Sequence, residues 1–132
     1  MFGGGNPVGG SNPSGTGGSI NYIGDFAYAY SGPITVNNNQ TTLIKFTTGA
    51  SLFVGTFRPS YTTSTSDNYG WTIKINDEII GYSEFISATP QGSITSEFDL
   101  IIAPFSKVEI VAQNTEDTDN NDVAALITGR VY

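Results

Sequence analysis

Residues 98–114, FDLIIAPFSKVEIVAQN, restrict the possible folds more than any other part of the chain. Apolar and polar side chains alternate on both sides of an expected tight turn at residues 103–106, so we expect this stretch to form a β-hairpin. The alternating apolar positions are Phe98, Leu100, Ile102, Val108 and Ile110. A period of two predicts two β-strands, each with one apolar face. Two strands cannot bury those faces alone, so a second sheet must lie opposite them.

Other segments of the chain repeat this pattern and can supply the second sheet. Residues 70–85 predict a hairpin in which Trp71, Ile73 and Ile75 point to one side and residues 76–78 form the turn. Further strands are expected at residues 25–30, 42–48, 52–57 and 123–132. Residues 49–51 are expected to join the strands at 42–48 and 52–57 in a hairpin-like connection. The expected core comprises Trp71, Ile73, Phe98, Leu100, Val108, Ile110 and Leu126.

Short strands at regular spacing, polar turns and the lack of helical periodicity predict an all-β fold, an antiparallel β-sandwich. A single eight-stranded jelly roll and an immunoglobulin-like sandwich both fit this pattern. The strand count and the absence of a Cys-Trp-Cys signature favour the jelly roll. We expect the sandwich domain to span residues 21–132.

Residues 1–20 differ in composition from the rest of the chain. Residues 1–19 hold 8 of the 16 glycines and only three apolar side chains, Met1, Phe2 and Val8. Such a segment cannot build a core. We expect an extended arm that becomes ordered on a neighbouring subunit, with Phe2 and Val8 as its anchors. A flexible leader or a cloning remnant is the alternative.

The composition excludes several classes of function. Twelve acidic and five basic residues give a net charge of -7, and the basic residues form no cluster, so nucleic acid is not an expected partner. Histidine and cysteine are absent, which removes the usual general base at neutral pH and all thiolate chemistry. No apolar run approaches the length of a membrane span, so no membrane partner is expected. No cofactor is expected either.

Residues 116–122, EDTDNND, form an acidic loop whose spacing invites comparison with a calcium site. Asp117, Asp119 and Asn121 have the spacing of the first three EF-hand ligands. Asp122 stands where the motif requires glycine, and Thr128 stands where it requires a bidentate glutamate. The loop is therefore no EF-hand. We favour a solvated acidic loop, with a looser calcium site at Asp117, Asp119 and Asn121 as the alternative.

Four carboxylates are conceivable members of a glycosidase pair: Glu84, Glu97, Asp99 and Glu109. Their spacing along the chain does not establish the separation in space that such a pair requires. All four occupy the polar positions of their strands. We therefore expect no catalytic residues and no enzyme activity.

A glycine-rich arm followed by a compact β domain that ends LIIAPFSKVEIVAQN...ITGRVY resembles small single-jelly-roll virion proteins. The resemblance is greatest to head decoration (cement) proteins of tailed bacteriophages and to minor capsid proteins. In actual residues it is confined to about the last thirty-five, where no motif is diagnostic. It implies a structural role on the capsid surface of a virion, made in the host cytoplasm. The implied partners are the major capsid protein and copies of the chain itself, in a homotrimer.

A carbohydrate-binding module is the second class of function that the pattern allows. Jelly rolls with exposed aromatic residues and acidic loops often hold sugars or calcium. The lack of a recognisable secretion signal and of an attached catalytic domain counts against this class. A virion adhesin would combine both readings, because a virion protein can itself bind a glycan.

Overall fold

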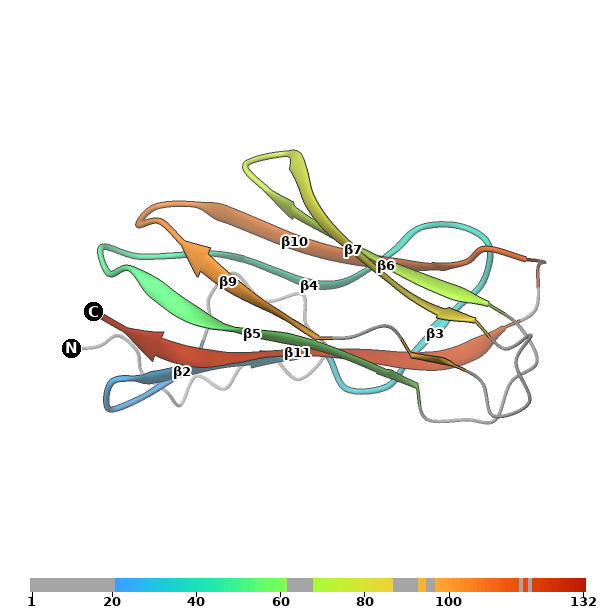
Figure 1. Ribbon diagram of the computed structural model, residues 1–132, viewed down its shortest axis with the longest axis horizontal. Helices are drawn as coiled ribbons and strands as arrows, with labels where there is room; N and C mark the ends of the chain where they lie inside the picture. Colours follow the sequence, from blue (N-terminus) through green and yellow to red (C-terminus); the bar gives the residue numbers. More distant parts are fainter. Residues whose placement is uncertain (1–20, 62–67, 87–92, 95–96, 117, 119) are drawn as a thin grey trace.

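A computed structural model describes residues 21–61, 68–86, 93–94, 97–116, 118 and 120–132 (Figure 1). These residues form strands and turns and no helix. The strands are β1 (Asn21–Ile23), β2 (Phe26–Tyr30), β3 (Ile34–Val36), β4 (Thr41–Thr47), β5 (Phe53–Tyr61), β6 (Tyr69–Ile75), β7 (Glu78–Ile86), β8 (Ser93–Ile94), β9 (Phe98–Ile102), β10 (Lys107–Asn114) and β11 (Asn121–Val131).

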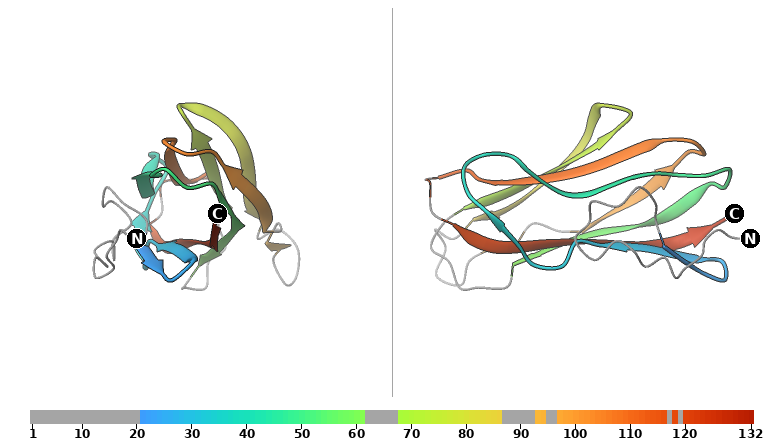
Figure 2. Two further views of the ribbon diagram at one scale, coloured as in Figure 1. Left: turned by 90° about the vertical axis from the view of Figure 1, so that its left-hand side faces the viewer. Right: turned by 180° about the vertical axis from the view of Figure 1, so that it is seen from behind.

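The strands form two antiparallel sheets. Sheet A has the order β1-β2-β11-β5-β9, and β3 also pairs with β11. Sheet B has the order β4-β10-β6-β7-β8. Viewed end-on, the two sheets curve around one interior (Figure 2). The predicted all-β antiparallel sandwich is confirmed.

The strand order is that of a jelly roll. Four antiparallel pairs are nested along the chain: β6 with β7, β5 with β9, β4 with β10, and β2 with β11. The chain is thus one long hairpin, folded back at the β6–β7 turn and rolled so that alternate pairs fall in opposite sheets. Eight strands arranged in this way are the jelly roll expected from the sequence. The short strands β1, β3 and β8 add to its edges.

The alternating stretch at residues 98–114 folds differently from the simplest expectation. It forms two strands and a turn, in which Phe105 has a φ of 58°. However, β9 belongs to sheet A and β10 to sheet B, so the two strands do not pair with each other. The same holds for β4 and β5. Alternation shows that a strand has one buried face, but it does not identify the neighbouring strand.

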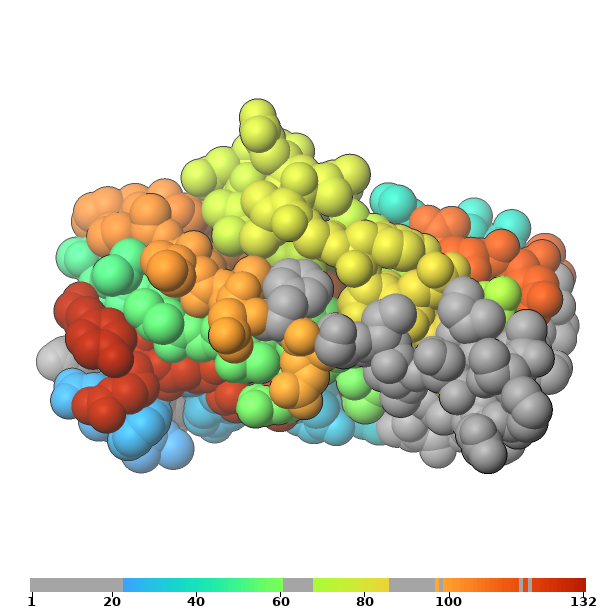
Figure 3. Space-filling view, viewed as in Figure 1, coloured from blue at the N-terminus to red at the C-terminus, as the bar shows by residue number. Residues whose placement is uncertain are grey.

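The β6–β7 hairpin, in contrast, forms as predicted, and its tip projects from the body of the molecule (Figure 3). Asn76 and Asp77 have φ angles of 53° and 69°, the left-handed conformations that a two-residue type I′ turn requires. The Asn76 amide N–H donates to the Lys107 carbonyl oxygen at 2.8 Å, and the Asn76 side-chain oxygen accepts from the Lys107 amide at 2.9 Å. These two bonds attach the turn to the start of β10.

The core lies between the sheets and contains most of the predicted residues. Trp71, Ile73, Leu100, Val108 and Ile110 are buried, as expected. The Phe98 side chain lies outside the described part of the structure. The prediction for Leu126 is wrong: its side chain is only partly buried, and the neighbouring Ile127 is fully buried instead.

The error at Leu126 has a simple cause. Residues 123–127 are all apolar, so this stretch carries no alternation that could identify the inward-facing positions. The register decides the matter, because Leu126 is paired with Tyr30 on one side and with Arg58 on the other, both of which point outward. Ile127 therefore points into the core.

Thr48 joins the two crossing turns at one end of the sandwich. It lies in the β4–β5 connection and is buried. Its hydroxyl donates to the Ala103 carbonyl oxygen at 2.9 Å and accepts from the Ser106 amide at 2.8 Å. Its own amide donates to the Ser106 carbonyl oxygen at 2.8 Å. One side chain thus satisfies two backbone groups of the β9–β10 turn, the buried amide of Ser106 and the partly buried carbonyl of Ala103.

Replacing Leu100 with alanine should lower the free energy of unfolding by about 2 to 5 kcal/mol, because the change leaves a cavity in the core. Chemical denaturation followed by circular dichroism measures this loss. Ile101→Ala is the matched control, since Ile101 is the next residue and is 70% exposed. Equal losses in the two variants would contradict the assigned faces of β9.

Thr48→Val should lower the free energy of unfolding by about 1 to 3 kcal/mol, because it leaves the buried Ser106 amide and the partly buried Ala103 carbonyl without their partner. The neighbouring Thr47 is exposed, so Thr47→Val should have little effect. Urea denaturation of both variants compares them directly. A Thr48→Val protein as stable as Thr47→Val would show that the hydroxyl does not hold the turns together.

Candidate functional site

The outer face of sheet A begins with the aromatic residues of β2. Ala27 and Ala29 are buried, and Phe26, Tyr28 and Tyr30 therefore point outward. The sequence left open whether the aromatic or the alanine side of this strand packs against the core. Small side chains lie on the inside here, so the large rings become part of the molecular surface.

The strand register extends this surface into rows that run across the sheet. One row consists of Ile23, Phe26, Arg130, Val54 and Ile101. We call the four apolar members, Ile23, Phe26, Val54 and Ile101, the apolar row. Ile23 is 66% exposed, Phe26 56% and Ile101 70%. Adjacent exposed apolar side chains on a sheet face are characteristic of an interaction surface.

Arg130 lies in the middle of the apolar row and is held along the surface. Its guanidinium carbon is 4.9 Å from the centre of the Phe26 ring. Its Nη2 is 3.9 Å from Oδ2 of Asp25. Both partners are exposed, so these contacts contribute little stability. Their consequence is structural, because they keep the cation beside the apolar side chains instead of extended into water.

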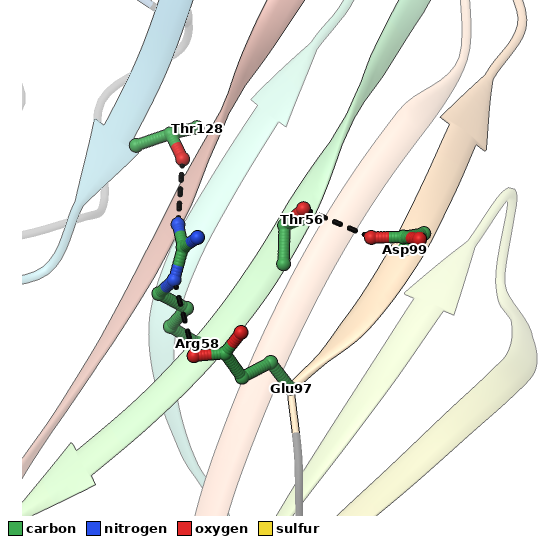
Figure 4. Close-up of polar contacts among 5 residues, drawn as sticks. All are labelled: Thr56, Arg58, Glu97, Asp99 and Thr128. Carbon is green, nitrogen blue, oxygen red and sulfur yellow. Dashed lines mark hydrogen bonds and ion pairs between the residues drawn. The ribbon is translucent and has the colours of Figure 1, made fainter.

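A polar network lies beside the apolar row (Figure 4). Thr56 of β5 donates to Oδ1 of Asp99 at 3.0 Å. Arg58 binds the Glu97 carboxylate through Nε at 3.2 Å and donates from Nη1 to the Thr128 hydroxyl at 2.9 Å. The network connects β9, β5 and β11. It borders one side of the apolar row with ordered polar groups, which resemble part of the polar rim of a protein interface.

A shallow hollow of about 440 Å³ lies at the β1–β2–β11 end of this face. Its walls are mostly apolar. They are formed by Ile23, Phe26, Ala27, Tyr28, Thr128, Gly129 and Arg130. The hollow thus continues the apolar row and offers an open, apolar surface that can receive a side chain.

The structure does not bring the four candidate carboxylates together. Glu97 and Asp99 lie on the outer face of sheet A, where each has the partner described above. Glu84 and Glu109 lie on sheet B, and the Glu109 carboxylate accepts from the Thr42 hydroxyl at 2.9 Å. A glycosidase needs two carboxyl groups that flank one bond of the substrate. A carboxylate of sheet A and a carboxylate of sheet B lie on opposite outer faces of the sandwich, so they cannot flank the same substrate bond.

The calcium candidates are only partly described. Asp117 and Asp119 lie outside the described residues. The side-chain amide of Asn121 donates to the Tyr69 hydroxyl at 2.9 Å, which places it toward the interior rather than in the acidic loop. Within the described ranges, no group of three or more acidic, histidine or cysteine side chains is arranged to hold a metal ion. A calcium site at this loop stays a prediction.

Phe2 and Val8, the expected anchors of the arm, also lie outside the described residues. The surface residues Ile101, Val54 and Arg130 were not among the sites predicted from the sequence. Ile101 carried a signal, because it is an apolar residue at a polar position of the alternation. No sequence signal places it beside Val54, since that requires the β5–β9 register.

No protein-family model matches the chain, and no curated protein sequence matches it. In the described part of the structure, no helix is long and apolar enough to span a membrane. The function must therefore be argued from the surface itself.

Neutralising the carboxylates should have only small effects. Glu97→Gln and Asp99→Asn each change the free energy of unfolding by less than about 1 kcal/mol, because exposed ion pairs and hydrogen bonds are weak. Glu84→Gln should behave in the same way. Thermal denaturation measures the stability, and a screen of glycoside substrates measures activity. A hydrolytic activity that is lost in any of these variants would overturn the expectation of a structural protein.

Proposed function

We propose that the chain is a structural virion protein, a capsid decoration (cement) or minor capsid component that stabilises the shell through contacts made by residues 1–20. It is not an enzyme. Its partners are the major capsid protein and further copies of itself in a homotrimer. The observation that carries the proposal is the apolar row of sheet A with its adjoining hollow.

The proposed occupant of the hollow is the N-terminal segment of a neighbouring copy. Residues 1–20 precede β1 directly, and Ile23 of β1 is one wall of the hollow. Twenty extended residues can span about 60 Å, enough to reach an adjacent subunit. Phe2 and Val8 are side chains that an apolar hollow can bury. The arm must overcome an ordering cost of about 1 to 2 kcal/mol per residue, so it needs such anchors.

The surroundings of the hollow suit a contact between copies of the chain. Aromatic residues and arginine are the residue types that contribute most to protein interfaces, and Phe26, Tyr28 and Arg130 lie together here. The Arg58–Glu97 pair forms part of the polar rim. Burying the apolar row removes exposed Ile23, Phe26 and Ile101 from water, which favours association.

Deleting residues 1–18 should leave the melting temperature almost unchanged, because none of the described core residues is lost. The full chain should sediment as a trimer in analytical ultracentrifugation, and the deletion variant should sediment as a monomer. Phe26→Ser should also weaken association at unchanged stability. Ile79→Ser is the matched control, since Ile79 is 68% exposed on sheet B, and it should remain trimeric.

The absence of native cysteine allows a direct test of where the arm binds. Two single variants, Phe2→Cys and Thr128→Cys, should form a mixed disulfide when they are combined and oxidised. A double variant that instead forms its disulfide within one chain at high dilution would contradict the proposal. The protein would then be a self-contained binding module, and its arm would not join subunits.

A further inference from the structure

Sheet B carries an aromatic side chain that lies along its outer surface. Tyr82 of β7 is 52% exposed and pairs with Thr72 of β6. A Cβ atom added to Gly70 would lie 2.2 Å from the Tyr82 hydroxyl oxygen and 2.8 Å from Cζ. The hydroxyl end of the ring therefore rests on the backbone at Gly70. The ring lies along the sheet because this position has no side chain.

Polar groups flank the ring at the level of Gly70. Glu84 of β7 is paired with Gly70 on one side, and Gln113 of β10 is paired with it on the other. Paired residues share a face, so both side chains are on the outer surface with Tyr82. Burial and, to a smaller extent, the nearby Glu84 carboxylate raise the pKa of Tyr82 above its ordinary value. A tyrosine hydroxyl is protonated at neutral pH even at its ordinary pKa, and the hydroxyl of Tyr82 can therefore donate a hydrogen bond.

Gln113 connects this ring to a polar hollow. Its Nε2 donates to the Asn38 carbonyl oxygen at 3.5 Å. The hollow measures about 480 Å³ and is lined by Asn38, Gln113, Asn114, Thr115, Glu116 and Thr118. All six lining residues carry an amide, hydroxyl or carboxylate group, and these groups can form hydrogen bonds with a hydroxyl-rich ligand.

We propose that the outer face of sheet B around Tyr82 binds a neutral oligosaccharide. The Tyr82 ring provides an apolar surface for the C–H face of one sugar, and Glu84 and Gln113 bind its hydroxyl groups. The next sugar occupies the hollow beside Gln113. An aromatic surface with a few directed polar groups is the usual composition of a small-ligand site. Glu84, Glu116 and the net charge of -7 disfavour acidic sugars.

The test is a titration of the full-length, ¹⁵N-labelled chain with cellopentaose, maltopentaose, mannopentaose and chitotetraose. At least one of these neutral probes should produce saturable shifts in the amide signals of Gly70, Tyr82 and Gln113. Tyr82→Ala should weaken that binding by about tenfold or more, which corresponds to about 1.4 kcal/mol. Tyr82→Phe should bind nearly as well as the parent chain, because it keeps the ring.

Gly70→Ala gives a second and independent readout. The new methyl group displaces the tip of a flexible side chain, so the fold should be retained while the ring is lifted from the sheet and binding is lost. Tyr30→Ala, an exposed tyrosine of sheet A, is the matched control and should bind normally. Normal binding by both Tyr82→Ala and Gly70→Ala would overturn the inference, and so would a lack of shifts with every probe at about 10 mM. Neither result depends on the oligomeric state. The sugar-binding inference can therefore be refuted while the proposed assembly role still holds.

Discussion

Burial of the interior that the two sheets share is the interaction on which this structure depends. Each sheet buries its inner apolar face against the other sheet, and the buried residues form one core. The nested pairing of the strands gives each sheet strands from both halves of the chain, and successive pairs lie on opposite sides of that interior. Buried polar contacts close it at both ends. Thr48 joins the crossing turns at one end, and at the other the Tyr69 hydroxyl accepts from Asn121 and donates to the Val36 carbonyl oxygen at 3.4 Å. The strands at each end are therefore joined by directional bonds as well as by packing.

The sequence was most informative where it alternated strictly. Trp71, Ile73, Val108 and Ile110 could be assigned to the core because they occupy alternate positions separated by polar residues, Thr72 in β6 and Glu109 in β10. The Asn-Asp pair at 76–77 indicated the turn. Leu126 was misplaced because its neighbours are all apolar. The pairing of the strands could not be predicted from the sequence, because a short turn can join either two paired strands of a hairpin or two strands that belong to different sheets. The surface residues of the apolar row became visible only with the register.

The two outer faces carry different chemistry. Sheet A presents apolar and aromatic side chains with a rim of paired charges, which suits contact with another protein surface. Around Tyr82, sheet B presents an aromatic ring beside amide and carboxylate groups, which suits a small polar ligand. The proposed roles therefore do not compete for the same residues. In a trimer, three weak sugar sites would act together on one glycan-coated surface, and their combined affinity would far exceed that of a single site.

The hollow on sheet A is built from strands near both ends of the described chain: Ile23 and Phe26 come from β1 and β2, and Thr128 and Arg130 come from β11. In the nested order, the β2–β11 pair is the outermost and joins the residues most distant in sequence, so its formation carries the largest loop-closure cost. During synthesis the hollow cannot exist until the last strand has left the ribosome. If the N-terminal segment of a neighbouring copy binds in this hollow as proposed, a truncated or half-folded copy cannot accept it, and only completely folded subunits can assemble.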